Sequence, residues 1–256
     1  ECACYGWFED AVLIVNSSTP FLLPMDISQQ VSEALASGRI SAVRNAFNAV
    51  CSLPIEQRGK PFRLGIVSTF TIETQTEVLA LAMSALPCQI EIKIADLENI
   101  EQELLNPASD LIRWEPDAFL VLWRLEELLP TLTFTPRTLS QETRAATILA
   151  LEERIENLTK GYLKVSKQPL FLSTLPLPQT DDLHDLHDES GRRHAIEKTN
   201  AVLLSSAAKN PRVSLLDFAG WAAKIGAIAF DRKMDLYARQ PIAASAIGDL
   251  SLLLAR

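Results

Sequence analysis

The sequence predicts an α/β fold, a three-layer doubly wound domain built on a mainly parallel five-stranded sheet. Predicted strands and helices alternate from residue 62 to the end of the chain, which is the pattern of parallel strands joined by crossover helices. The run from Ala118 to Trp123 is fully apolar, as is typical of a strand covered on both faces. With 256 residues, 48% of them hydrophobic, the chain can bury a large core.

The N-terminal part differs from this pattern, and we assign residues 1–61 to an appendage and linker in front of an α/β domain at 62–256. Short apolar runs alternate with Pro20 and Pro24, which predicts extended segments and turns. Apolar residues recur at helical spacing over residues 27–53 and are interrupted at Gly38, which predicts two helices.

Within the domain, each element is predicted from its own periodicity. Strands are expected at residues 64–67, 89–95, 118–123, 170–174 and 213–218. Helices are expected at residues 73–86, 97–105, about 139–158, 191–209 and 243–255. A further helix is expected to include Ala223. A charged loop, residues 231–242, is expected before the last helix.

Composition narrows the possible functions. The 24 basic and 32 acidic residues leave a net charge of -8, which disfavours nucleic acid and anionic membranes as partners. Four scattered cysteines form neither a disulfide framework nor a zinc-binding pattern. No apolar stretch is long enough to cross a membrane and no leader is evident, so we expect a cytoplasmic protein. We also expect no cofactor.

The candidate site lies where the first strand ends. Residues 64–67 are apolar, and Ser68, Thr69 and Thr71 follow before a helical pattern begins. Ligands of open α/β sheets bind at such junctions. Ser68 is therefore a nucleophile, an anion ligand or only a helix cap. Neither a G-x-G-x-x-G nor a G-x-x-x-x-G-K-[ST] sequence is present, which disfavours dinucleotides and nucleoside triphosphates bound in those ways.

A nucleophilic serine needs a base, and the chain has three histidines, His184, His187 and His194, all after the fourth strand. They stand among aspartates, which would raise histidine basicity if they lie close. At spacing three, His184 and His187 also suit a metal site. We favour a solvated, mobile loop and expect no metal, because Asp-rich segments seldom order by themselves.

Two arginines are further candidates. Arg239 lies in the charged loop, where it faces an anion at Ser68 or forms a surface ion pair. Trp123 ends the third strand beside Arg124 and Glu126, so these residues border the expected cleft, although we favour core or edge packing over ligand binding for Trp123 itself.

Several stretches, in order, resemble the N-terminal region of FkbH-like proteins. They are residues 64–71, 102–111 and 115–122, then Asn200, Asp217 and residues 237–242. The resemblance covers about residues 62–256 and implies an SGNH-hydrolase-like or flavodoxin-like fold. In that family this domain precedes a HAD-type phosphatase-like domain, and the protein loads a glyceryl group onto an acyl carrier protein in polyketide-type biosynthesis. No Asp-x-Asp motif of a HAD domain occurs here, which implies a fragment without the phosphoryl chemistry.

On the SGNH-hydrolase pattern, Ser68 or Thr69 falls near the nucleophile and Trp123-Arg124 near the oxyanion hole, where glycine and asparagine are missing. The histidine expected before the last helix is also missing. Our first hypothesis is a catalytically degenerate domain that positions a carrier protein, a HAD-type domain or an anionic acyl or glyceryl ligand. The alternatives are an active esterase or acyltransferase with Ser68 as nucleophile, and a purely structural interaction module. The expected ligand-binding residues are Thr69, Thr71, Arg124, Asn200 and Arg239.

Overall fold

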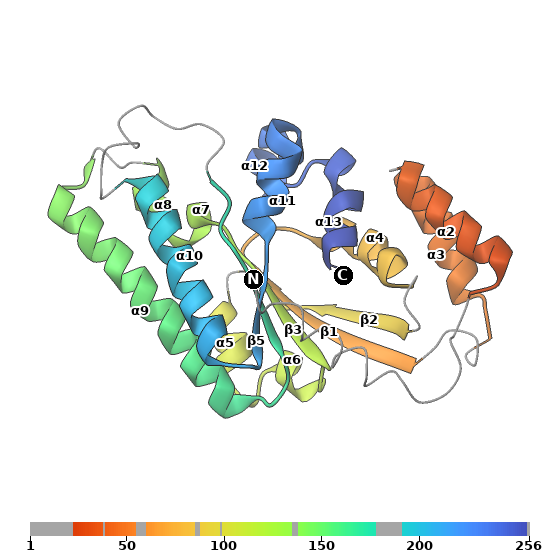
Figure 1. The fold of residues 1–256 in the computed structure, drawn as a ribbon, viewed down its shortest axis with the longest axis horizontal. Coiled ribbons are helices and arrows are strands. Elements are labelled where there is room, and N and C mark those ends of the chain that lie inside the picture. The colour runs from red at the N-terminus through yellow and green to blue at the C-terminus, as the bar shows by residue number, and fades with distance from the viewer. Residues whose placement is uncertain are drawn as a thin grey trace, which may run out of the picture.

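The structure is a computed structural model that describes residues 23–37, 39–54, 60–84, 88–97, 99–134, 138–177 and 191–254. Five parallel strands form one sheet in the order β2-β1-β3-β4-β5 (Figure 1). They are β1 (Lys60–Ser68), β2 (Cys88–Ile94), β3 (Ala118–Leu122), β4 (Leu170–Ser173) and β5 (Val213–Leu216). The predicted doubly wound fold is confirmed, and the strand order reverses between β1 and β3, where a ligand crevice is expected.

Alternate residues of the central strands enter two separate hydrophobic cores, one on each face of the sheet. Ile66 and Leu120 belong to the first core, whereas Val67 and Val121 belong to the second. Every residue of β3 is buried. This two-sided burial explains why the central strands are continuous apolar runs, and it makes the domain three layers thick.

The helices divide between the two cores. The first core is covered by α4 (Glu73–Ser84), α11 (Phe218–Ile225) and α13 (Ile247–Leu254). The second is covered by α5 (Ile100–Leu105), α6 (Asp110–Arg113), α7 (Leu125–Leu128), α8 (Pro130–Phe134), α9 (Gln141–Val165) and α10 (Arg192–Lys209). Two short 3-10 helices, η4 (Gly226–Ala229) and η5 (Ala244–Ala246), complete the chain's C-terminal part. The sequence did not predict α6, α7 and α8, because helices of four or five residues carry too little periodicity.

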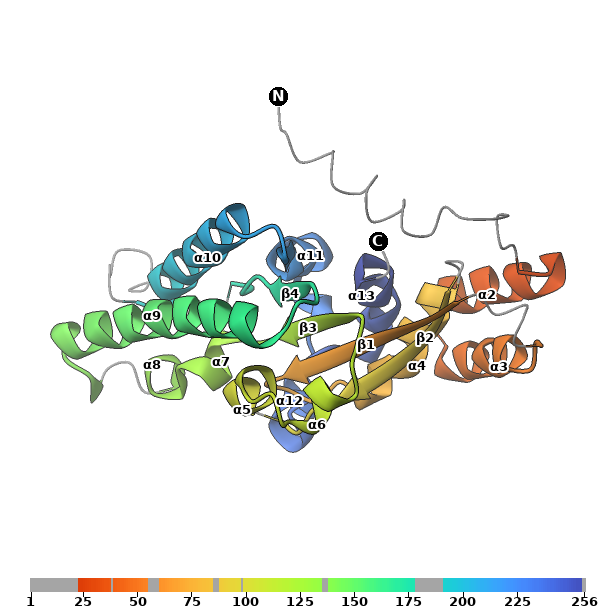
Figure 2. The same ribbon diagram turned by 90° about the horizontal axis from the view of Figure 1, so that it is seen from below.

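Two helices precede the sheet, as the break at Gly38 predicted: α2 (Met25–Ser37) and α3 (Ile40–Cys51). They lie beside α4 at the β2 end of the molecule, opposite α9 and α10 (Figure 2). Val31 and Val43 are buried in the first core together with residues of α4. These two helices therefore pack on the domain through an apolar interface. The predicted extended segments before residue 23 lie outside the described residues.

The predicted charged loop at residues 231–242 was wrong in part, because it contains helix α12 (Arg232–Ala238). Asp231 caps this helix by accepting hydrogen bonds from the backbone N–H groups of Lys233 and Met234, both at 3.0 Å. The helix ends at Arg239, whose φ of 49° is left-handed. No residue of α12 is buried, which is why its sequence lacks an apolar stripe.

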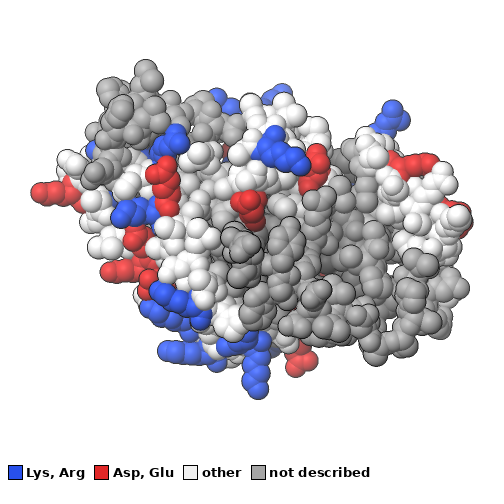
Figure 3. Space-filling model, in the orientation of Figure 1, with Lys and Arg blue, Asp and Glu red and all other residues white. Residues whose placement is uncertain are grey.

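Charged side chains are spread over the face shown in Figure 3, with Lys and Arg gathered along its lower edge below α9 and α10. Lys164 and Lys209 stand in the last turns of these helices, where positive charge complements the helix dipole. Of the helices within the described ranges, none combines the length and apolarity that crossing a membrane requires.

Tyr162 of α9 gives the fold a specific alkaline sensitivity. It is buried against Phe119, and its hydroxyl donates to the carbonyl of Gln168 at 2.8 Å. Burial raises the pKa of Tyr162 from 10.0 to about 12. The unfolded chain releases the Tyr162 proton at a lower pH than the folded chain does. The free energy of unfolding should therefore be unaffected by this group below pH 10 and should fall as the pH rises toward 12. Urea denaturation below and above pH 10 measures this loss of free energy of unfolding. The loss should be smaller in Tyr162→Phe. An equal decline in both proteins would contradict the assignment.

Candidate functional site

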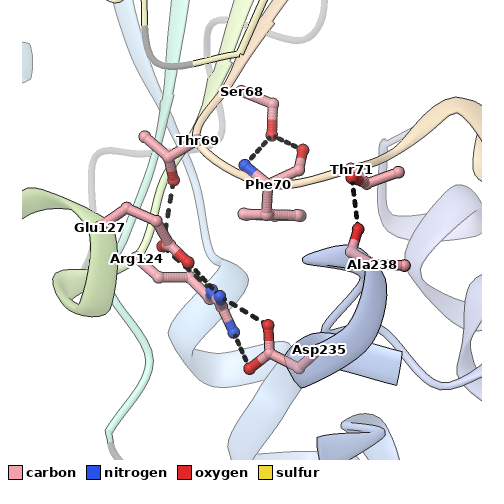
Figure 4. Close-up of polar contacts among 8 residues, drawn as sticks. All are labelled: Ser68, Thr69, Phe70, Thr71, Arg124, Glu127, Asp235 and Ala238. Carbon is pink, nitrogen blue, oxygen red and sulfur yellow. Dashed lines mark hydrogen bonds and ion pairs between the residues drawn. The ribbon is translucent and has the colours of Figure 1, made fainter. Parts of the chain in front are cut away.

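Ser68 is the last residue of β1, at the predicted junction, but its hydroxyl is enclosed. The residue is 0% exposed. Its Oγ donates to the carbonyl of Phe70 at 2.7 Å and accepts from the Phe70 N–H at 3.1 Å, so the hydroxyl closes a turn of its own backbone (Figure 4). This is a local structural use of the serine, and four residues separate it from the start of α4.

Thr71 joins this turn to α12. Its hydroxyl donates to the carbonyl of Ala238 at 2.8 Å (Figure 4). Its N–H donates to the carbonyl of Arg239, also at 2.8 Å. The backbone at the end of β1 therefore holds the C-terminal end of α12. Thr71 and Arg239 therefore lie together, but their contact joins main-chain atoms and the sequence did not predict it.

Arg124, which follows β3, is the centre of a buried polar cluster. The residue is 5% exposed. Its Nε donates to Glu127 Oε2 at 3.2 Å and its Nη2 to Glu127 Oε1. Nη1 and Nη2 each donate to one carboxylate oxygen of Asp235, both at 3.0 Å. Thr69 completes the cluster by donating its hydroxyl to Glu127 Oε2 at 3.3 Å.

Figure 4 shows the Arg124 guanidinium and the Asp235 carboxylate on the opposite side of the Phe70 ring from the Ser68 hydroxyl. The guanidinium carbon of Arg124 lies 5.4 Å from the centroid of that ring, which is a cation–π contact. The structure therefore separates two features that the sequence placed in one pocket. Ser68 faces its own turn, and Arg124 faces two carboxylates.

Burial and charge act in opposite directions within the cluster. Burial raises the pKa of Glu127, the charge of Arg124 opposes that rise, and neighbouring Glu126 and Asp235 add to it. For Arg124, burial alone would lower the pKa, but the bonds to Asp235 and Glu127 outweigh it and raise the pKa above its usual range. Arg124 is thus a permanent buried cation that two carboxylates share.

A cleft of about 1090 Å³ opens beside this cluster, between α7 and α8 on one side and α12 on the other. Arg124, Glu127 and Asp235 line it, whereas Ser68 is not among its lining residues. Four of its lining residues are exposed apolar or aromatic side chains: Phe134, Leu177, Leu236 and Tyr237. Arg232 and Lys233 of α12 add exposed positive charge. The cleft can accept an amphipathic, anionic group.

The remaining predicted site residues lie elsewhere or cannot be placed. Asn200 clamps the backbone of Leu175, accepting from its N–H at 2.8 Å and donating to its carbonyl at 2.9 Å. It therefore fixes the chain just after β4. His194 lies in the first turn of α10, while His184 and His187 lie outside the described residues. Within the ranges that the structure covers, no group of side chains is arranged to hold a metal ion.

No family model matches this chain, and no curated protein sequence matches it either. Its fold is similar to that of the N-terminal part of BF1531 from Bacteroides fragilis, a structure that contains a phosphatase domain and was solved with Mg. The two share a TM-score of 0.70 and 14% sequence identity over 81% of this chain and 54% of that one. This chain thus spans about half of that structure. At this identity the similarity establishes the fold alone.

Two further structures are similar at a lower level. One is a candidate SGNH hydrolase from Slackia heliotrinireducens, with 12% identity over 77% of this chain and 97% of that one. The other is LAE5, an α/β hydrolase from the metagenome of Lake Arreo in Spain, with 12% identity over 77% of this chain and 95% of that one. Both have a TM-score of 0.42, which is too low to support a functional comparison.

Sequence reasoning missed Glu127 and Asp235, the two partners of Arg124. Glu127 could have been found, since it follows Arg124 at the i,i+3 spacing at which helical side chains meet. Asp235 lies 111 residues beyond Arg124, and nothing in its local sequence indicates that pairing.

Proposed function

We propose that this chain is a non-hydrolytic SGNH-like domain of an FkbH-like protein, which uses the cleft between α7–α8 and α12 to bind and position a partner. The partner is a carrier protein, a HAD-type domain or an anionic acyl or glyceryl ligand. The α/β fold supports the SGNH-like assignment. The FkbH-like assignment is supported by the sequence resemblance that runs, in the same order, from residues 64–71 to residues 237–242.

One observation carries the non-hydrolytic part of the proposal. Attack by a serine requires an exposed Oγ, a base that takes its proton, and room for the acyl carbonyl about 3 Å away. Ser68 is fully buried, and it donates its proton to the Phe70 carbonyl, which is not a base. Its Oγ also accepts the Phe70 N–H. Both hydrogen bonds of the hydroxyl are therefore made within the turn.

The cleft supports the binding part. Its exposed apolar side chains would cost free energy if left in water, and patches of this kind mark interaction sites. Arg232 and Lys233 provide attraction for an acidic partner at its rim. The Bacteroides fragilis structure contains a phosphatase domain and matches this chain over 54% of its own length, which agrees with a role beside a HAD-type neighbour.

The catalytic half is tested with short-chain p-nitrophenyl esters. We expect the wild-type protein and Ser68→Ala to give the same background rate, because Ser68 has no access to substrate. A wild-type rate that Ser68→Ala abolishes, with folding retained, would show an active esterase instead.

The binding part of the proposal is tested by co-purification with a carrier protein or a HAD-type domain. We expect Arg232→Glu combined with Lys233→Glu to weaken capture at least tenfold, because it reverses two charges at the cleft. Lys164→Glu combined with Lys209→Glu is the matched control on α9 and α10, and it should leave capture unchanged. Equal capture by all three proteins would refute a role for the cleft.

A further inference from the structure

The two carboxylates on Arg124 are held very differently. Glu127 comes from the adjacent helix α7, its side chain is 11% exposed, and it also accepts the Thr69 hydroxyl. Asp235 comes from α12, and its side chain is 33% exposed and lines the cleft. Glu127 is therefore a fixed part of the cluster, whereas Asp235 is its accessible part.

The charges of the cluster do not balance. One guanidinium faces two carboxylates, so the ionised cluster carries one negative charge too many. Glu127 alone would neutralise Arg124. Asp235 is the surplus carboxylate, and it loses part of its hydration by lying on the guanidinium.

The geometry of the Asp235 contact is that of a bound anion. Nη1 and Nη2 of Arg124 each donate to one carboxylate oxygen at 3.0 Å, which is the two-point arrangement by which arginine binds carboxylates and phosphates. The helix that carries Asp235 has no buried residue, so little apolar contact holds it in place. What holds its C-terminal end instead is a pair of hydrogen bonds from Thr71.

We propose that Arg124 is an anion-binding site and that Asp235 is an internal competitor occupying it. A ligand carboxylate or phosphate replaces Asp235 on the Nη1–Nη2 edge of the guanidinium. Exchange of one anion for another keeps two anionic partners on the guanidinium, and the released Asp235 regains its hydration. Glu127 keeps the guanidinium in place during the exchange, and α12 stays tethered at Thr71.

The cleft next to Arg124 specifies the rest of the ligand. Its lining includes four exposed apolar or aromatic side chains, Phe134, Leu177, Leu236 and Tyr237. The ligand is therefore an anion that carries an apolar chain. This inference rests on the proposed function, since it concerns the same cleft. It adds that an anionic ligand binds Arg124 by displacing Asp235.

Calorimetric titration of the full chain with octanoate, octyl phosphate and neutral octanamide tests the exchange. We expect Asp235→Asn to bind at least one of the two anions at least tenfold more tightly than the wild type, because it removes the competing charge. Octanamide should bind both proteins equally. The order of the two anions identifies the ligand as a carboxylate or a phosphate.

Two controls separate this result from a general charge effect and from misfolding. Glu153→Gln removes one exposed negative charge on α9, and it should leave anion affinity at the wild-type value. Arg124→Lys in the Asp235→Asn background keeps the charge but not the two-point geometry, and it should lose the gain. An equal gain in Glu153→Gln, or a gain that survives Arg124→Lys, would overturn the proposal.

A direct measurement covers the case in which the lysine variant does not fold. Saturating octanoate or octyl phosphate should shift the backbone amide resonances of residues 233–237 in the wild-type protein, because Asp235 leaves its site. Saturation without such shifts would refute the exchange. Ser68-dependent ester hydrolysis would refute the proposed function, and it has no bearing on these titrations, so the two failures are distinguishable.

Discussion

Replacing Arg124 with alanine is expected to lower the free energy of unfolding by about 3 to 5 kcal/mol. The substitution leaves Glu127 and Asp235 facing each other without a cation, and the Glu127 side chain is only 11% exposed. It also removes the contact with the Phe70 ring. Urea denaturation followed by circular dichroism measures the loss.

A second substitution shows whether the unpaired charge causes this loss. Glu127→Gln removes the buried carboxylate, so Arg124→Ala should cost less in that background than in the wild type. Arg113→Ala, at an exposed position on α6, is the matched control and should change stability by less than about 0.5 kcal/mol. Equal costs of Arg124→Ala in both backgrounds would rule out the electrostatic explanation.

Trp123→Ala should lower the free energy of unfolding by about 3 to 5 kcal/mol, chiefly through the cavity it leaves. Trp123 is among the largest fully buried side chains. Its Nε1 donates to the Ser173 carbonyl at 2.6 Å, and its N–H donates to the Ser173 hydroxyl at 3.3 Å. It therefore fixes the end of β3, from which Arg124 projects, against the end of β4.

The conservative variant separates packing from hydrogen bonding. Trp123→Phe keeps most of the ring but loses the bond to Ser173, and it should cost about 1 to 3 kcal/mol because a buried carbonyl loses a partner. Trp114→Phe, at a half-buried position beside Arg63, is the comparison and should cost less. A Trp123→Ala variant as stable as Trp114→Phe would contradict the assignment of Trp123 to the core.

Much of the fold was predictable from the sequence because burial leaves a local record. Residues 118–122 are apolar at every position since β3 is covered on both faces, and the break in helical periodicity near residue 38 agrees with the end of α2 at Ser37 and the start of α3 at Ile40. Helix α12 left no such record. It buries no residue, so its sequence is that of a charged loop, and its start depends on the cap at Asp231.

The candidate site was predictable only in part. The sequence by itself determined that the first strand ends at Val67 with Ser68 directly after it, that Arg124 follows the third strand, and that both stand at one edge of a parallel sheet, because strand order and apolar periodicity fix those positions. Only the tertiary structure decided that the Ser68 hydroxyl closes a turn with Phe70 and that Arg124 lies on Asp235, 111 residues away. A side chain's partners depend on which distant segment packs against it, and that information is not contained in local periodicity.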